Sequence, residues 1–209
     1  MKIKISKASL KYHFRYYIWA YVGVVLITGM LLNLVVTAIN SQAPPDKTLS
    51  LYVCGEAVKA SSYYQFRTDL EEAFSDMELI NTDNMTYKGA NASSAYKQKF
   101  AALIASNQGD ILVLPYEDFT DLVGMDAFQP LDELLPEDIA ELDEAALKTV
   151  TFKYNTEDPK VYGIPLTGHS LFAEDDWYPM EDKVLVIMNS SQNLSNAVRM
   201  AEWVLDRQV

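Results

Sequence analysis

An unbroken apolar stretch near the N-terminus is the strongest pattern in this chain. No Asp, Glu, Lys or Arg falls within residues 16–45, and residues 16–38 read YYIWAYVGVVLITGMLLNLVVTA. A helix over these 23 residues spans about 35 Å, which is enough to cross a hydrocarbon core of about 30 Å with some tilt. We therefore expect a transmembrane helix over residues 16–38.

Short apolar runs alternate with segments of helical spacing through the rest of the chain. Strand-like runs occur at residues 49–54, 77–81, 110–115, 160–166 and 183–188. Helical spacing or helix-start signals cover residues 61–75, 95–105, 117–124, 136 to about 148, and 194–207 after Asn193 as N-cap. Alternation of strands and helices is typical of a largely parallel sheet covered by helices on both faces. The pattern predicts an α/β lobe.

Charge divides the chain into three parts. Residues 1–15 carry five basic residues and no acid, whereas all 29 acidic residues follow the apolar stretch. This asymmetry predicts a cytoplasmic N-terminus and an extracellular body, and the aromatic residues at the basic end suit a membrane interface. The expected order is a cytoplasmic basic segment (1–15), a transmembrane signal-anchor (16–38), a linker (39–48) and an extracellular lobe (49–209).

The apolar stretch also has two other interpretations. In a cleaved signal peptide, Val36 and Ala38 would fit the positions before the cleavage site, although the stretch is longer than a usual signal-peptide core. A buried helix of a soluble protein is the remaining alternative.

Composition excludes several classes of function. One cysteine rules out an intramolecular disulfide framework and a cysteine-rich metal site, and two histidines far apart leave little for a histidine site. A net charge of −12 argues against nucleic acid as a partner. We expect no cofactor and no metal.

Five segments of the body carry a family resemblance. They are LSLYVC (49–54), KFAALIASNQGDILVLPYEDFTDLV (99–123), AFQPLDELL (127–135), KVYGIPL (160–166) and VLVIMNSSQNLSNAVRMAEWVLD (184–206). In this order the body resembles an extracellular solute-binding protein of the carbohydrate ABC-transporter type, in the periplasmic-binding-protein-like class II. The resemblance implies a periplasmic-binding-protein-like lobe that binds a small solute such as a sugar, works with an ABC permease and performs no catalysis.

The chain departs from this family after its first lobe. Only 17 residues, TGHSLFAEDDWYPMEDK (167–183), separate Leu166 from Val184, which is too few for a second lobe. A single lobe leaves one wall of the binding cleft open to water unless another chain supplies the missing wall. The alternative function is therefore a degenerate lobe that binds no solute and acts as a protein-interaction or accessory module outside the membrane.

Candidate ligand residues follow from where ligands bind in open α/β sheets, beyond the carboxyl ends of the strands. The expected ends are at residues 55–56, 81–82, 115–117 and 166–169. Tyr116 could stack on a sugar ring, Glu56 and Glu117 could accept hydrogen bonds from hydroxyls, and His169 is a further contact candidate. Alternatively, Tyr116 covers the sheet edge and the acids are solvated. No GxSxG-type turn is present, so no catalytic residue is expected.

The segment AEDDWYPMED (173–182) surrounds aromatic residues with acids, so Trp177 and Tyr178 are candidate contacts for a protein partner. The alternatives are a solvated loop in which Trp177 plugs the sheet edge, or a calcium site, for which the ligand spacing is missing. Outside this segment, we expect Asp110 to fix backbone amides and Cys54 to be a small buried apolar residue.

Overall fold

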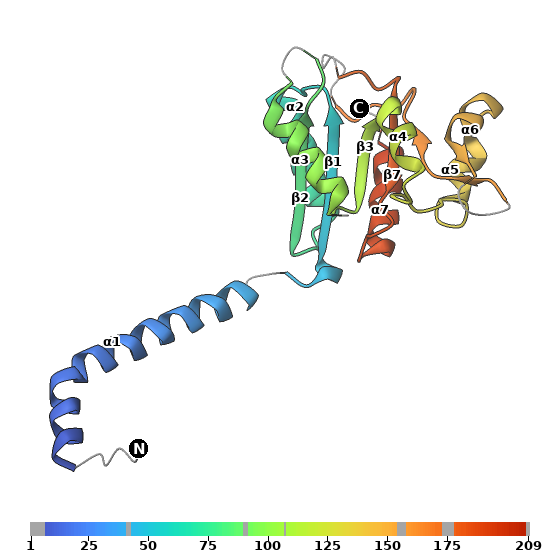
Figure 1. Ribbon diagram of the computed structural model, residues 1–209. Coiled ribbons are helices and arrows are strands. Elements are labelled where there is room, and N and C mark those ends of the chain that lie inside the picture. The colour runs from blue at the N-terminus through green and yellow to red at the C-terminus, as the bar shows by residue number, and fades with distance from the viewer. Residues whose placement is uncertain are drawn as a thin grey trace. The chain divides into compact units, whose positions relative to one another are not determined.

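The computed structural model describes residues 7–40, 43–89, 92–106, 108–153, 158–172 and 178–207, in two compact units, Met1–Ala43 and Pro44–Val209 (Figure 1). The first unit consists of helix α1 (Lys7–Asn40), which confirms the predicted helix and extends it at both ends. Within α1, the 19 residues Arg15–Asn33 have a mean hydropathy of 1.5 and none of them is buried. By length and composition this segment could cross a membrane, and a signal sequence would meet the same criterion.

The second unit is built on a five-stranded sheet. After a short 3-10 helix (Pro45–Lys47), its strands are β1 (Thr48–Gly55), β2 (Leu79–Thr86), β3 (Ile111–Pro115), β6 (Ile164–Pro165) and β7 (Lys183–Ile187), in the spatial order β2-β1-β3-β7-β6. The strand β1 is parallel to β2 and β3, and β7 is antiparallel to β3 and β6. Four strands therefore share one direction, which confirms the predicted mostly parallel α/β lobe. Strands β4 (Thr151–Phe152) and β5 (Lys160–Val161) form a separate antiparallel pair.

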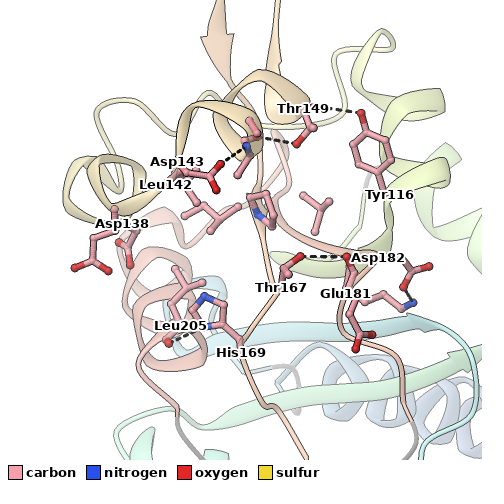
Figure 2. Close-up of a pocket in the computed structure, with 17 residues that line it drawn as sticks. Tyr116, Asp138, Leu142, Asp143, Thr149, Thr167, His169, Glu181, Asp182 and Leu205 are labelled. Carbon is pink, nitrogen blue, oxygen red and sulfur yellow. Dashed lines mark hydrogen bonds and ion pairs between the residues drawn. The ribbon is translucent and has the colours of Figure 1, made fainter.

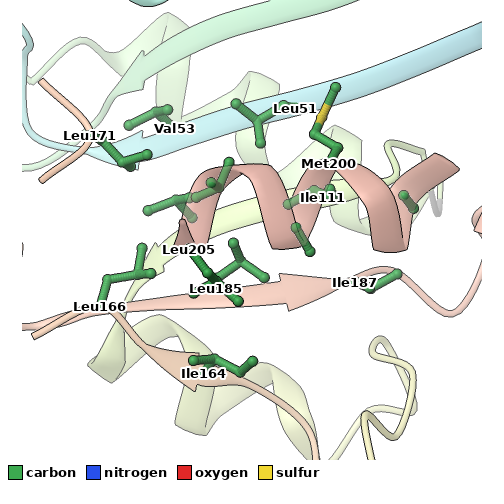
Figure 3. Packing of buried hydrophobic residues seen from close by; sticks show 14 of the residues in the cluster. Leu51, Val53, Ile111, Ile164, Leu166, Leu171, Leu185, Ile187, Met200 and Leu205 are labelled. Carbon is green, nitrogen blue, oxygen red and sulfur yellow. The ribbon is translucent and has the colours of Figure 1, made fainter. Parts of the chain in front are cut away.

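Helices cover both faces of this sheet. On one face, α2 (Ala60–Ala73) and α7 (Leu194–Leu205) pack on alternate residues of β1, β3 and β7. Figure 3 shows Met200 and Leu205 of α7 against Leu51, Ile111 and Leu185. On the other face, α3 (Ser94–Ala105) and α4 (Tyr116–Val123) contribute to a second cluster with Leu112, Leu114 and Val186. Because β3 and β7 are buried on both faces, they have the continuous apolar sequences that predicted them.

Two sequence-based boundaries are wrong, and the strand-like run at residues 160–166 is divided between β5 and β6, which belong to different sheets. The helix expected from Pro136 to about Lys148 is two helices, α5 (Pro136–Glu141) and α6 (Glu144–Val150). The break occurs because Leu142 is extended and the Asp143 carboxylate accepts a hydrogen bond from the Ala146 amide at 2.7 Å, which starts a new helix.

The second wrong boundary is the end of β2, which continues to Thr86 instead of ending near residue 81. Its polar second half hides the strand from a hydrophobicity pattern. Asn84 is held there by hydrogen bonds with the Val58 amide and with the carbonyls of Val53 and Glu56.

Polar side chains fix the amino-terminal edge of the sheet. Asp110 accepts hydrogen bonds from the Ser50 amide at 2.8 Å and from Ser191 Oγ at 2.5 Å, which confirms its structural role. Asn193 occupies the N-cap position of α7 as predicted, but it does not cap the helix with its side chain. Its amide instead donates to the carbonyls of Asp46 and Thr48. Cys54 is buried, as predicted.

Candidate functional site

The carboxyl ends of β1 and β3 and the first residue of β7 meet at one edge of the sheet. Pro115, the last residue of β3, pairs with Lys183 in the antiparallel register of β3 and β7. The chain then turns directly into α4, and the Tyr116 amide donates to the Asp182 carbonyl at 2.7 Å. The topology thus places Tyr116 beside the segment that leads into β7.

A cavity of about 710 Å³ opens beside this edge. Its lining comes from the start of α4, from α5 and α6, from β6 and the turn after it, from the start of β7 and from the end of α7 (Figure 2). A volume of this order suits a small-molecule ligand. Two of the four predicted ligand residues, Tyr116 and His169, line it, whereas Glu56 and Glu117 do not.

Tyr116 borders the cavity next to α6. Its hydroxyl donates to the Thr149 carbonyl at 3.4 Å, and its ring lies 6.2 Å from that of Phe119. Hydrogen bonds thus hold both the backbone amide and the hydroxyl of Tyr116, but the residue remains 38% exposed. An accessible aromatic ring in a cavity can stack on an apolar ring face of a ligand.

His169 lies across the cavity from Tyr116 (Figure 2). Its amide donates to the Leu166 carbonyl, and its Nδ1 lies 3.1 Å from the Leu205 carbonyl oxygen. Because a carbonyl can only accept, Nδ1 carries the proton of this hydrogen bond. In the neutral ring, Nε2 is then a hydrogen-bond acceptor.

Acidic residues dominate the remaining polar lining. They are Asp138 and Glu141 of α5, Asp143 between the two helices, and Glu181 and Asp182 before β7. Burial raises the pKa of Asp138, and the nearby acids Asp206, Glu141 and Glu137 raise it further. The Glu181 carbonyl accepts a hydrogen bond from the Thr167 hydroxyl, which ties the turn after β6 to this segment. The cavity therefore offers mainly acceptors for hydroxyl or amino groups.

Glu56 forms an ion pair with a buried lysine next to the cavity. Lys183 Nζ lies 3.1 Å from Glu56 Oε2, in an ion pair that lacks hydrogen-bond alignment, and it also pairs with Asp182. The Lys183 side chain is 0% exposed and its amino group lies 5.1 Å from the centre of the Tyr178 ring. The sequence pattern did not predict that Lys183 is buried, because a lysine at the first position of a strand-like run is usually solvated.

Glu117 points to a different part of the surface. Its carboxylate pairs with Lys88 Nζ at 3.0 Å, and Lys88 also approaches Asp118 at 3.4 Å. Asp118 accepts a hydrogen bond from the Tyr87 hydroxyl at 2.9 Å. The four predicted ligand residues are therefore split between the cavity and two ion-paired groups.

The predicted partner-contact residues also differ in their placement. Trp177 lies outside the described residues, so its role stays a prediction. Tyr178 is only 5% exposed, and its hydroxyl donates to the Cys54 carbonyl at the end of β1 at 2.8 Å. Burial raises its pKa well above the ordinary value. Tyr178 therefore covers the sheet edge at the end of β1, which is the role considered for Trp177.

Among the side chains of the described ranges, no group of three His, Cys, Asp or Glu is placed to hold a metal ion. Glu181 and Asp182 are the described acids of the segment considered for calcium, and Asp182 is paired with Lys183.

Comparison with known proteins gives no match to a protein-family model or to a curated protein. Solved structures that align with part of this chain include an extracellular solute-binding protein family 1 member from Alicyclobacillus acidocaldarius, with 20% identity over 60% of this chain and a TM-score of 0.44. An ABC substrate-binding protein from Listeria monocytogenes in complex with cycloalternan has 22% identity over 56% of this chain and a TM-score of 0.39. An N-glycan transport solute-binding protein from Streptococcus pneumoniae has 17% identity over 57% and a TM-score of 0.38.

These structures are of the class that the sequence resembles. The chain covers 29%, 28% and 25% of their respective lengths, less than a third in each case.

Proposed function

We propose that this protein is a membrane-tethered, extracellular lobe that binds a small polyhydroxylated solute, such as a sugar. The observation that carries the proposal is the cavity of about 710 Å³, which brings together Tyr116 and His169 from separate segments of the chain. Both were expected to contact ligand from their positions after strands.

The lining suits a neutral polyol better than an anion. Tyr116 would stack on the apolar face of a sugar ring, and His169 Nε2 would accept a hydrogen bond from a hydroxyl. The acids of α5 and of the segment before β7 would accept further hydroxyl hydrogen bonds, while they would repel a carboxylate or phosphate. Because the cavity is partly open to solvent, we expect weak binding unless a partner, such as an ABC permease, closes it.

The tether would be α1. Its described side chains between Tyr16 and Leu32 are almost all exposed and mostly apolar, a pattern that suits lipid as the surrounding medium. The basic residues before this segment favour an N-terminus in the cytoplasm, which would put the lobe outside.

Thermal unfolding of the full chain in detergent tests the proposal. The panel contains mono- and oligosaccharides, with amino acids and carboxylated sugars for comparison. A ligand that binds only the folded state raises stability by about 2.7 kcal/mol at 100 times its dissociation constant. We expect a shift with one or more neutral sugars that Tyr116→Ala abolishes.

Tyr64→Ala is the matched control, since Tyr64 is a 73% exposed tyrosine of α2 outside the cavity. The shift should persist in this variant. A cooperatively unfolding protein with no shift for any neutral sugar would contradict the proposal.

A protein-interaction function is the second candidate, and the sealed strand edge favours it. Tyr178 and the Lys183–Glu56 ion pair fill the position beyond the end of β1 where a ligand could otherwise bind. In that case the acidic cavity lining would contact basic groups of a membrane partner. A photo-crosslinker placed at Thr167 would then capture a membrane protein in cells. The same crosslink would form in the Tyr116→Ala variant.

A further inference from the structure

The strand β2 is an open edge of the sheet. It pairs with β1 along all of its eight residues, from Leu79 to Thr86, and it lies at the end of the strand order (Figure 1). Among the described residues, the only backbone hydrogen bond that reaches its outer side runs from the Ser93 amide to the Thr86 carbonyl at 3.3 Å. Most of this edge can therefore accept another strand.

The backbone groups on the outer side can be identified by alternation. The Thr86 carbonyl faces outward to Ser93, whereas the Tyr87 amide faces inward and donates to the Gly55 carbonyl. Successive residues of a strand direct their amide and carbonyl groups to opposite sides. The outward groups are therefore those of Ile80, Thr82 and Asn84.

Few of the usual devices that block an edge are present. Residues 79–86 contain no proline and no lysine, and their only charge, Asp83, is paired with Lys99 of α3. Leu79, at the start of the strand, is 43% exposed although it is apolar.

We propose that β2 pairs with β2 of a second copy of this chain, antiparallel and about a two-fold axis through Thr82. The outward groups of Thr82 would then bond with those of the second Thr82, and Ile80 would bond with Asn84 in both directions. Between these pairs, Asn81 lies opposite Asp83 and Leu79 lies opposite Met85. The single acid of the edge thus meets an amide, and the exposed Leu79 meets an apolar position, Met85, whose side chain is buried in the second cluster of the lobe.

The neighbouring registers are worse. An axis through Asp83 places two carboxylates directly opposite each other and requires the Thr86 carbonyl, which already bonds with Ser93. An axis through Asn81 places Leu79 opposite Asp83, which sets an apolar side chain against a charge. The register centred on Thr82 is therefore the best one when β2 pairs with another β2. A second copy of this chain is the partner that fits this edge. The pairing requires no bound solute.

Disulfide crosslinking tests the register. In the proposed pairing, residues 81 and 83 of the two copies face each other with Cα atoms about 4.5 Å apart, within the range for a disulfide. Two differently tagged full-length copies, Asn81→Cys and Asp83→Cys, are expressed together. We expect a mixed disulfide dimer, with much less homodimer from either variant alone.

The native Cys54 is fully buried and stays in place. Tyr64→Cys, at an exposed position on α2, is the control for random collision. A mixed disulfide no more frequent than in this control would overturn the proposal. Efficient crosslinking of Asp83→Cys or Asn81→Cys with itself would overturn the register.

Light scattering of the uncrosslinked protein in detergent gives a second test, since it needs no cysteine. Thr82→Pro removes an outward amide but no hydrogen bond to β1, whereas Thr82→Ala keeps the amide. We expect Thr82→Ala to be dimeric and Thr82→Pro to be monomeric, with circular dichroism confirming that both fold. A monomeric Thr82→Ala, or a dimeric Thr82→Pro, would overturn the proposal.

Discussion

Lys183 offers a sharp test of how the strand edge is held. Its side chain is 0% exposed, whereas its partners Glu56 and Asp182 are 29% and 55% exposed. If Lys183 is removed, Asp182 stays hydrated, and Glu56, whose Oε2 is buried against Lys183, has to turn this oxygen into water. Because the Glu56 side chain already reaches the surface, we expect the loss of attraction to be small. The buried aliphatic stem should contribute more to stability than the charge.

The expected loss can be worked out from the stem. Lys183→Ala removes three methylene groups, which at about 0.8 kcal/mol each amounts to about 2.4 kcal/mol. The cavity left behind adds on the order of 1 kcal/mol, so we expect a loss of about 2–4 kcal/mol. Lys183→Met keeps most of the stem and should cost less than about 1.5 kcal/mol.

Urea unfolding of the unit Pro44–Val209, which contains both hydrophobic clusters, gives these differences. In thermal unfolding of the same unit, a change of 1 kcal/mol corresponds to a shift in Tm of about 2–4 °C for a protein of this size. Lys97→Ala, at an exposed position on α3, is the control and should stay within about 0.5 kcal/mol of the wild type. If Lys183→Met is as unstable as Lys183→Ala, the ion pair and not the buried stem holds the strand edge, contrary to this prediction.

Three further predictions concern other parts of the lobe. Gly163→Ala should cost about 1–3 kcal/mol in thermal unfolding, because the new Cβ would overlap Val184, while Gly124→Ala meets no atom within 4 Å and should cost much less. Burial raises the pKa of Asp110 above 3.8, so its stabilising contribution is present at low pH and is lost as pH rises through the raised value. Asp110→Asn should therefore gain stability relative to the wild type from pH 4 upward in urea titrations, and an unchanged difference would contradict this. The hydrogen bond from Arg207 lowers the pKa of Asp69, so that contribution is present above pH 3.8 and is lost in acid; Arg207→Gln should flatten the acid side of the stability profile, whereas an unchanged slope would argue against the pair.

Much of the fold could be predicted because its central strands are buried on both faces. Residues 110–115 and 183–188 have continuous apolar runs for that reason, and residues 49–54 alternate between two cores. The second half of β2 could not be predicted in this way, since an edge strand needs few apolar residues and Asn84 is held by hydrogen bonds instead. The break at Leu142 depends on the capping bond of Asp143, which competes with helix continuation in a way that spacing does not show.

The candidate site was only partly predictable. The rule that ligands bind beyond the strand ends identified Tyr116 and His169, which line the cavity. It could not separate them from Glu56 and Glu117, because their ion partners Lys183 and Lys88 come from distant segments. Tyr178 is likewise buried at a position where its hydroxyl bonds with the carbonyl of Cys54, a residue far away in the sequence, and no local pattern encodes this contact.

We propose that one lobe holds a solute in the cavity between Tyr116 and His169. An amide chemical-shift titration of the unit Pro44–Val209 with a mixture of neutral sugars tests it most directly, because it reports both binding and place. We predict saturable shifts for the amides of Tyr116, Thr167 and His169, with none along β2. No saturable shift in a folded protein, or shifts confined to other surfaces, would contradict the claim.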